Sequence, residues 1–540
     1  MNTDNPAQAG DSSRPPAPHA SVARSAFLVG AGIFLSRIAG LVRERILAHY
    51  FGTTLAADAF RAAMKIPNFL QNLFGEGVIS ASFIPVYAKL QAQGEKEEAG
   101  RVAGAIFSLL ALITSFVVLA GVLATPWFVA AIAPGFAGEK RRLTIQLVRI
   151  LFPGVGFLVI SSWCLGILNS HGRFFLSYVS PVVWNAAVIA SLIWYGGRVE
   201  LSYLAVYGIW GSVAGSLLQL LVQLPVVLRL APAIRLGLGV ANQNVRTVIV
   251  NFVPVFISRG VVQLSAFVDT ILASPLPTGG VAALGYAQTI YLLPVSLFGM
   301  AVSAAELPGM SSVLGNEQQV AELLRGRILS STRRIGFFVV PSAVAFFVLG
   351  DIVASAIYQT NNGRFQHADS AYVWGILAGS AVGLVASTVG RLYSSAYYAL
   401  RDTRTPLRFA ILRVVLTTAL GYLAALPLPK LLGIDPKWGV AGLTASAGFA
   451  AWVEFLLLRR GMNRRIGHSQ FPTIYFAKLW MSAVAAAGVA WGIRLWLHPQ
   501  RPLVAAALIL IPYGLAYLGL TAALGIEQAS ALARRIMRRS

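Results

Sequence analysis

The chain has 540 residues, of which 56% are hydrophobic and 12% charged, and its mean hydropathy is +0.69. This composition excludes an ordinary soluble domain, because apolar runs of about 20 residues, long enough to span a bilayer as helices, recur from Ser25 almost to the C-terminus. The formal net charge of +23 does not indicate nucleic acid as a partner, since the basic residues lie mostly in short segments between these runs. Long continuous runs predict an all-α polytopic membrane protein rather than an outer-membrane barrel.

Sequence signals of catalysis, metal binding and nucleotide binding are absent. The chain contains no GxxxxGK[ST] loop, and no Ser, His and Asp constellation or carboxylate pair suggests catalysis. The six histidines are scattered without ligand-like spacing, and the single cysteine, Cys164, excludes a disulfide within the chain. We therefore expect a protein that is not an enzyme and that holds no metal or organic cofactor.

Residues 1–23 are polar and rich in proline and serine, which predicts a disordered cytoplasmic tail. About fourteen membrane-spanning helices are expected after it, at 26–49, 55–90, 101–133, 143–169, 174–196, 201–229, 246–273, 281–314, 320–358, 370–400, 406–428, 438–460, 474–497 and 502–525. With the N-terminus inside, most loop arginines and lysines fall on the cytoplasmic side. The positive-inside rule therefore places both termini in the cytoplasm.

An internal repeat divides the chain. FLSRIAG at 34–40 is repeated as FISRGVV at 256–262, and SASFIPV at 80–86 is repeated as SAAELPG at 303–309. Because the offset between the copies is nearly constant, we expect two related six-helix lobes.

The repeat fixes the expected organisation. An N-lobe at 24–230 and a C-lobe at 231–465 should enclose a central cavity. Residues 466–540 lie outside the repeat and contain the last two helices and a basic cytoplasmic tail.

The stretch 33–87 carries more charge than membrane-depth helices usually tolerate. At 100° per residue, one face of its second helix collects the following polar residues: Asp58, Arg61, Lys65, Asn68, Asn72 and Glu76. On the preceding helix, one side collects Ser36, Arg37, Gly40, Arg43 and Glu44. Charges at this depth normally face a bundle interior or a wet pathway, so the two stripes are expected to line the cavity.

Arginine is suited to phosphate in such a cavity, because its planar fork binds two oxygens and keeps its charge where a buried lysine would lose it. Arg37 and Arg259 stand at equivalent positions of the two repeats. We therefore expect them to approach one ligand from both lobes. Glu44, Arg45 and Glu76 have an alternative role as structural partners of nearby bases.

The motifs also resemble those of a known family. FLSRIAGLVRE, AADAF, KIPNFLQNLF and EGVISASFIPV, with VDTILAS, YAQTI and YALRDTRTP further along, are similar to the MurJ (MviN) lipid II flippases of the MOP exporter superfamily. The resemblance covers essentially all the expected spans. It implies a cationic cavity between two lobes and a groove for the polyprenyl tail formed by the last two helices. By motif, the family's cavity positions fall on Ser36, Arg37, Arg43, Glu44, Asp58, Lys65, Asn68 and Glu76.

Two positions depart from the family pattern. Gln71 and Thr289 stand where the family commonly has cavity arginines that would bind the diphosphate. Arg61 and Arg259 are the candidates to compensate and complete the expected substrate-binding set. Asp269 matches an acidic residue associated with cation binding in some members and is a candidate cation site, although Thr417 and Gly421 stand where its partners would be.

The resemblance implies a flippase that moves lipid II, the undecaprenyl-diphosphate-linked peptidoglycan precursor, outward across the bacterial inner membrane by alternating access. Membrane potential or a coupling cation would drive it, and its partners would be lipid II, membrane lipids and, as a further expectation, the cell-wall synthesis machinery. The alternatives are a flippase for another polyprenyl-linked glycan, a cation-coupled multidrug exporter, and a membrane enzyme acting on lipid-linked sugar. A drug exporter favours an acidic cavity, and an enzyme needs the catalytic groups that the sequence lacks.

Overall fold

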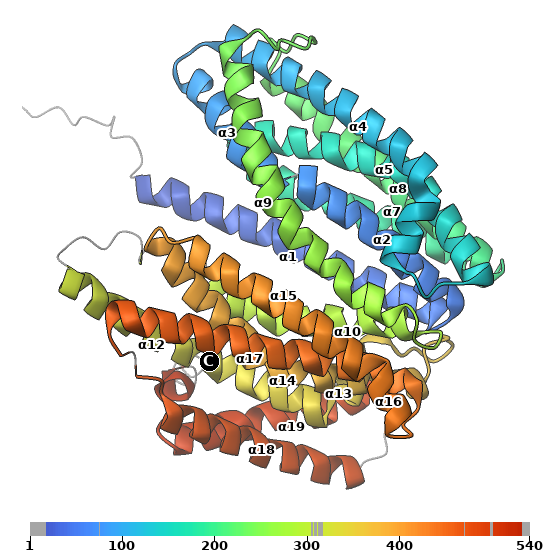
Figure 1. Ribbon diagram of the computed structural model, residues 1–540, viewed down its shortest axis with the longest axis vertical. Helices are drawn as coiled ribbons and strands as arrows, with labels where there is room; N and C mark the ends of the chain where they lie inside the picture. Colours follow the sequence, from blue (N-terminus) through green and yellow to red (C-terminus); the bar gives the residue numbers. More distant parts are fainter. Residues whose placement is uncertain are drawn as a thin grey trace, which may run out of the picture.

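The structure is a computed structural model that describes residues 18–74, 76–303, 306, 310, 317–468, 470–496 and 501–531, without the side chains of 18–28, 67–68, 71–72, 76, 257–266 and 317. Every regular element in these ranges is a helix, as the apolar runs predict. The helices form two groups that lie one above the other in Figure 1; α1 lies between them, and α9 runs from the upper group down to the lower one.

The first group is a bundle centred on α5, which packs against α2, α4 and α8. The bundle contains α1 (Pro18–Phe51), α2 (Leu55–Phe74), α3 (Glu76–Ala92), α4 (Lys96–Ile132), α5 (Gly138–Ser170), α6 (Phe174–Val179), α7 (Pro181–Tyr195) and α8 (Leu201–Leu230). We call it the N-lobe. Its α1 begins at Pro18, inside the segment expected to be a disordered tail. The single span expected at 55–90 is described as α2 and α3, and Gly75 between them lies outside the described residues.

The second group is centred on α14, which packs against α12 and α17. It contains α10 (Gly280–Pro294), the π-helical segment η1 (Val295–Met300), α12 (Glu317–Val348), α13 (Gly350–Tyr358), α14 (His367–Ala399), α15 (Arg404–Ala425), α16 (Pro427–Leu431), the 3₁₀ turn η2 (Pro436–Trp438) and α17 (Gly439–Ile466). A Cβ on Gly383 would lie 2.3 Å from the Cα of Gly448. Glycine at this crossing therefore lets α14 and α17 approach backbone to backbone, as is common in membrane bundles. We call this group the C-lobe.

Helix α9 (Gln243–Ala273) joins the two lobes. The side chain of Asn242 caps its N-terminus by accepting hydrogen bonds from the backbone N–H groups of Asn244 and Val245. Its first half lies against α3 and α4, and its far end reaches α15 and α17 (Figure 1). The helix expected to open the C-lobe thus packs on both lobes.

The last two helices, α18 (Thr473–Trp496) and α19 (Pro502–Ala523), form a hairpin on the outer side of the C-lobe (Figure 1). Tyr513 and Tyr517 of α19 donate hydrogen bonds to the carbonyls of Pro341 and Phe337 in α12. Arg494 of α18 forms an ion pair with Asp351 of α13 at 2.7 Å. The hairpin is therefore held against α12 by hydrogen bonds and against α13 by an ion pair.

Within the described residues, eleven helical segments are long and apolar enough to cross a membrane, which makes this a multi-pass membrane protein. They correspond to eleven of the expected spans. The other three spans, expected at 26–49, 55–90 and 246–273, are helical as α1, α2 with α3, and α9, and part of each lies outside the described side chains. Their crossing of the membrane stays a prediction.

Candidate functional site

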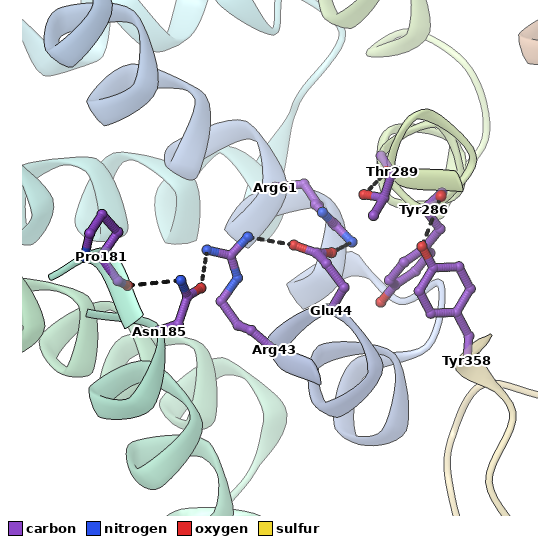
Figure 2. Close-up of polar contacts among 9 residues, drawn as sticks. Arg43, Glu44, Arg61, Pro181, Asn185, Tyr286, Thr289 and Tyr358 are labelled. Atoms are coloured by element: carbon purple, nitrogen blue, oxygen red, sulfur yellow. Dashed lines mark hydrogen bonds and ion pairs between the residues drawn. The ribbon is translucent and has the colours of Figure 1, made fainter. Parts of the chain in front are cut away.

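The centre of the site is a cluster of charges on α1 and α2. The carboxylate of Glu44, 4% exposed, accepts a hydrogen bond of 2.7 Å from Arg43 and forms an ion pair with Arg61 through its other oxygen (Figure 2). A buried carboxylate is tolerated only when it is paired in this way. The two arginines therefore hold Glu44, and the cluster retains one net positive charge.

The N-lobe holds Arg43 from a second helix. Its guanidinium donates to the Asn185 side-chain oxygen at 3.1 Å and lies 4.9 Å from the ring centroid of Trp184, both on α7. Asn185 in turn donates to the carbonyl of Pro181 at 2.9 Å (Figure 2). The head of Arg43 is fixed by an ion pair, a hydrogen bond and a cation–π contact.

Arg61 faces the C-lobe. Its guanidinium lies 4.5 Å from the ring centroid of Tyr286 in α10. Tyr286 donates to the carbonyl of Gly52 at 3.0 Å. Tyr358 donates to the carbonyl of Tyr286 at 2.9 Å (Figure 2). Arg61 is thus held where the two lobes meet.

A cavity of about 320 Å³ opens beside this cluster, between the N-lobe and α10. We call it the polar pocket. Its lining is Arg43, Glu44, Leu47, Phe60, Arg61, Met64, Lys65, Val281, Leu284, Gly285, Gln288, Thr289 and Leu292. Three cations and one anion by formal charge give the lining an excess of two positive charges, in a volume at the lower end of ligand pockets.

Lys65 and Asp269 lie where α2, α9 and α10 meet. The Lys65 ammonium donates to the Thr270 hydroxyl, and an Asp269 carboxylate oxygen accepts from the Gln288 amide at 3.1 Å. Lys65 and Arg413 are electrostatic neighbours of Asp269. In the described part of the chain, no group of three His, Cys, Asp or Glu side chains is placed to hold a metal ion. The expected role of Asp269 as a cation site stays a prediction.

Asp58 does not line the polar pocket. It is 1% exposed, and one oxygen accepts from Lys140 of α5 and from the Gly279 backbone N–H, each at 2.8 Å. Its other oxygen accepts from the Ala282 N–H at 2.8 Å. Asp58 therefore caps the start of α10, where a helix exposes unpaired N–H groups, and fastens α10 to α2 and α5.

Further contacts join the two lobes near the end of α1. Arg45 donates to the carbonyls of Ala356 and Ile357 at 2.7 and 2.9 Å. His49 is hydrogen-bonded to Thr360, and Thr53 donates to Asp369. With Asp58, Gly52 and Tyr286, these contacts close the end of the molecule where α1 ends and α10 begins. We call this set the interlobe seal.

The remaining expected residues lie away from the polar pocket or outside the described side chains. Arg37 is exposed and donates to the Ser296 hydroxyl of η1 at 3.3 Å, so it reaches across to the C-lobe; Ser36 beside it is partly exposed. The expected positions whose side chains lie outside the described residues are Asn68, Gln71, Glu76 and Arg259. The expected meeting of Arg37 with Arg259 therefore stays a prediction.

Sequence reasoning brought together Arg43, Glu44, Arg61 and Lys65, and the structure places all four in the polar pocket. It missed Gln288, Tyr286 and Lys140, because each lies on another element and meets α2 only through tertiary packing. The sequence offered one indication that Gln288 belongs to the site: it stands directly before Thr289 in YAQTI. Thr289 lines the pocket but donates its hydroxyl to the carbonyl of Gly285 in its own helix, so the pocket has no guanidinium there.

Two helical lobes that meet at one end around a basic pocket are the arrangement of a multi-pass membrane transporter. The sequence profile of the lipid II flippase MurJ matches residues 47–513. The chain belongs to this family.

Individual members of this family are similar to the chain over most of its length. The chain is 31% identical to a probable lipid II flippase MurJ of Rhizobium tropici, over 90% of this chain and 89% of that one. It is 29% identical to the lipid II flippase MurJ of Burkholderia cenocepacia, over 88% and 89%.

Solved structures agree on the fold. A lipid II flippase MurJ in an inward closed conformation is similar with a TM-score of 0.75 at 22% identity, covering 92% of this chain and 98% of that one. An inward-facing MATE family multidrug transporter of the MOP superfamily is similar with a TM-score of 0.61 at 16% identity, over 80% and 96%.

Proposed function

We propose that this protein flips lipid II from the inner to the outer leaflet of the bacterial cytoplasmic membrane by alternating access. The observation that carries the proposal is the excess of two positive charges in the polar pocket, which matches the charge of a diphosphate group. Arg43 and Arg61 are the residues we assign to that group, with Lys65 beside them. Guanidinium forks bind phosphate oxygens in pairs, which favours a phosphate over a neutral ligand.

The interlobe seal gives the transport cycle a starting state. By the positive-inside rule, the end of α1 that carries Gly52 and Thr53 faces outward. The seal then closes the outer side, and the substrate loads from the cytoplasm. Both termini lie in the cytoplasm in this orientation.

Membrane potential is the driving force we propose. Moving two negative charges outward across an inside-negative membrane is favourable by up to about 5 kcal/mol per 100 mV, since each charge contributes about 2.3 kcal/mol. The surroundings of Asp269, with Lys65 and Arg413 nearby, give a coupling cation less support.

One alternative has an observation in its favour. A flippase for another polyprenyl-linked glycan would share the diphosphate and differ in the sugar or peptide. That observation is Thr289, which leaves the polar pocket without a guanidinium at a position where the family commonly has an arginine. If the substrate is lipid II, Arg61, whose guanidinium lies over the ring of Tyr286, compensates for the missing arginine. Cationic drugs are disfavoured by the same basic pocket.

Rescue of a host tests the proposal. After depletion of the host's own lipid II flippase, expression of this chain should restore growth and outward-exposed lipid II. Arg43→Gln should lower the exposure by at least about tenfold, because a hydrogen bond from a charged group is worth roughly 1.5–3 kcal/mol.

The matched control is Arg101→Gln on α4, whose side chain is 55% exposed and far from the pocket; it should retain full activity. Membrane-inserted wild-type protein that never restores exposed lipid II would overturn the substrate assignment. Rescue of a different polyprenyl-linked glycan in the same assay would establish the alternative.

A further inference from the structure

The C-lobe carries a second group of charged residues, away from the arginines of α1 and α2. Arg413 of α15 forms an ion pair of 3.1 Å with Glu454 of α17, and Arg391 of α14 has both of them as electrostatic neighbours. We call these three residues the C-lobe charge cluster. Two arginines and one glutamate give it an excess of one positive charge by formal charge. All three residues lie outside the lining of the polar pocket.

Arg391 carries the excess charge of this cluster. Glu454 is paired with Arg413, and in the described part of the chain Arg391 forms neither a hydrogen bond nor an ion pair. Arg391 lies about 12 Å inside the end of α14 at Ala399, an end predicted to be cytoplasmic. An arginine within a membrane span normally pairs with an anion or faces a water-filled cavity, because lipid does not solvate its charge.

The position of Arg391 on α14 indicates that it faces the interior of the protein. Four residues before it, Ser387 is hydrogen-bonded to Tyr291 of α10 at 2.9 Å, and positions four apart share one face of a helix. Tyr291 is also an electrostatic neighbour of Arg391. Residues of α10, α15 and α17 therefore surround Arg391 on the central helix of the C-lobe, yet Arg391 is exposed. Exposure at such a position indicates contact with water rather than with lipid.

A row of polar side chains joins the C-lobe charge cluster to the polar pocket. Gln288 lines the polar pocket and donates to Asp269, and Asp269 has Arg413 as an electrostatic neighbour. Helices α10 and α14 both begin at the interlobe seal, and the hydrogen bond of Tyr291 to α14 shows where they are level. Arg391 therefore lies about 10 Å further from the seal than Gln288 does.

We propose that Arg391 binds a carboxylate of the transported headgroup while the diphosphate group occupies the polar pocket, an inference that rests on the proposed function. Lipid II carries a peptide with free carboxylates, joined to its diphosphate through a sugar, and this headgroup is long enough to reach from one site to the other. The single excess charge of the C-lobe charge cluster matches one carboxylate. A guanidinium fork binds both oxygens of a carboxylate in one plane.

The ion pair between Arg413 and Glu454 keeps Arg391 available for this carboxylate. The Glu454 side chain is only 13% exposed, and without Arg413 its charge would be drawn to Arg391, its other basic neighbour. Arg413 is therefore a positioning residue, and Arg391 is the residue that contacts the ligand.

Binding of two lipid II probes to the purified full-length protein tests the proposal. The acid probe is lipid II with free peptide carboxylates, and the amide probe is lipid II in which these carboxylates are converted to carboxamides. The wild type should bind the acid probe about tenfold more tightly, the size expected of a hydrogen bond between charged groups. Arg391→Gln should reduce the affinity for the acid probe to that for the amide probe and leave the affinity for the amide probe unchanged.

Two further variants serve as comparisons. Arg391→Lys keeps the charge and loses the planar fork, so it should still prefer the acid probe, by a smaller factor than the wild type does. Arg229→Gln removes an exposed arginine from the last turn of α8 in the N-lobe and should bind both probes as the wild type does.

The outcomes separate this inference from the proposed function. Equal affinity of the wild type for the two probes, or an undiminished acid preference in Arg391→Gln, would overturn the carboxylate site and leave the transport function intact. Equal loss of both probes in Arg391→Gln would also overturn it, because the effect would not depend on the carboxylates. Failure of the wild type to bind either probe would overturn the proposed substrate, and the carboxylate site with it.

Discussion

Glu44 is buried and has two guanidinium partners, and this determines what its removal does. In Glu44→Gln the two arginines lose the charge that holds them, and two like charges remain buried beside each other. Breaking a buried ion pair in this way typically costs about 3–5 kcal/mol. We expect a lower melting temperature of the detergent-purified protein, measured by intrinsic fluorescence on heating.

Glu97→Gln is the matched control for this prediction. Glu97 also pairs with an arginine, Arg101 at 3.6 Å, but its side chain is 71% exposed. An exposed pair of this kind contributes at most about 0.5 kcal/mol. Equal melting temperatures of Glu44→Gln and Glu97→Gln would show that Glu44 is not the structural centre of the cluster.

Asp402 gives the expected pH dependence at the surface predicted to be cytoplasmic. It lies in the loop between α14 and α15, where the Thr405 backbone N–H donates to it at 3.0 Å and the Thr405 hydroxyl at 2.7 Å, while Arg465 pairs with it at 2.6 Å. These contacts, the Thr405 N–H first, hold the pKa of Asp402 below its ordinary range. The stability that they contribute is therefore present above about pH 4 and is lost as pH falls through the lowered pKa.

Asp402→Asn tests the predicted loss of this stability at low pH. At pH 7 the variant should be less stable than the wild type by at most about 1 kcal/mol, since the group is near solvent. Melting curves from pH 7 down to about pH 3 should converge as Asp402 of the wild type becomes protonated. A difference that grows on acidification would contradict the assignment.

At the scale of elements, the start of α10 depends on one glycine. Gly279 has φ of +95°, and a Cβ there would lie 2.5 Å from the Thr53 carbonyl oxygen. Gly279→Ala therefore combines backbone strain with a clash against the turn between α1 and α2. We expect hydrogen exchange to accelerate in the segments around Thr53 and Gly279, because the interlobe seal loosens.

Gly433→Ala provides the comparison. Gly433 also has positive φ, +66°, but no atom lies within 4 Å of a Cβ built there. It should show only the cost of the backbone conformation, about 1–2 kcal/mol, with exchange at the seal unchanged. Unaltered protection of the seal in Gly279→Ala would mean that the close approach of these backbones is not what closes it.

For the whole molecule, alternating access requires the interlobe seal to open. Cysteines at Thr53 and Asp369, which are hydrogen-bonded across the seal, should join the lobes when linked by oxidation or a short bifunctional reagent. The chain's own Cys164 is fully buried and should contribute no background. Outward exposure of lipid II should stop on linking and, for the disulfide, return on reduction.

Each single cysteine variant is the control, because it removes the hydrogen bond without joining the lobes. Both should keep their activity under oxidising conditions. A fully linked protein that still exposes lipid II would exclude rocking of the lobes at this end.

Hydrophobic length and charge pattern in the sequence determined the all-helical membrane fold, because a span must satisfy its backbone internally and bury its charges. They also determined which helix faces carry Arg43, Glu44, Arg61 and Lys65, since periodicity along one helix is a local property. Periodicity does not reveal what faces such a stripe. Only the tertiary structure decided that Asp58 caps α10 instead of lining the pocket, that Gln288 and Tyr286 complete the site, and that α9 packs on both lobes. Each of these depends on contacts between residues far apart in the chain, whose partners no local pattern specifies.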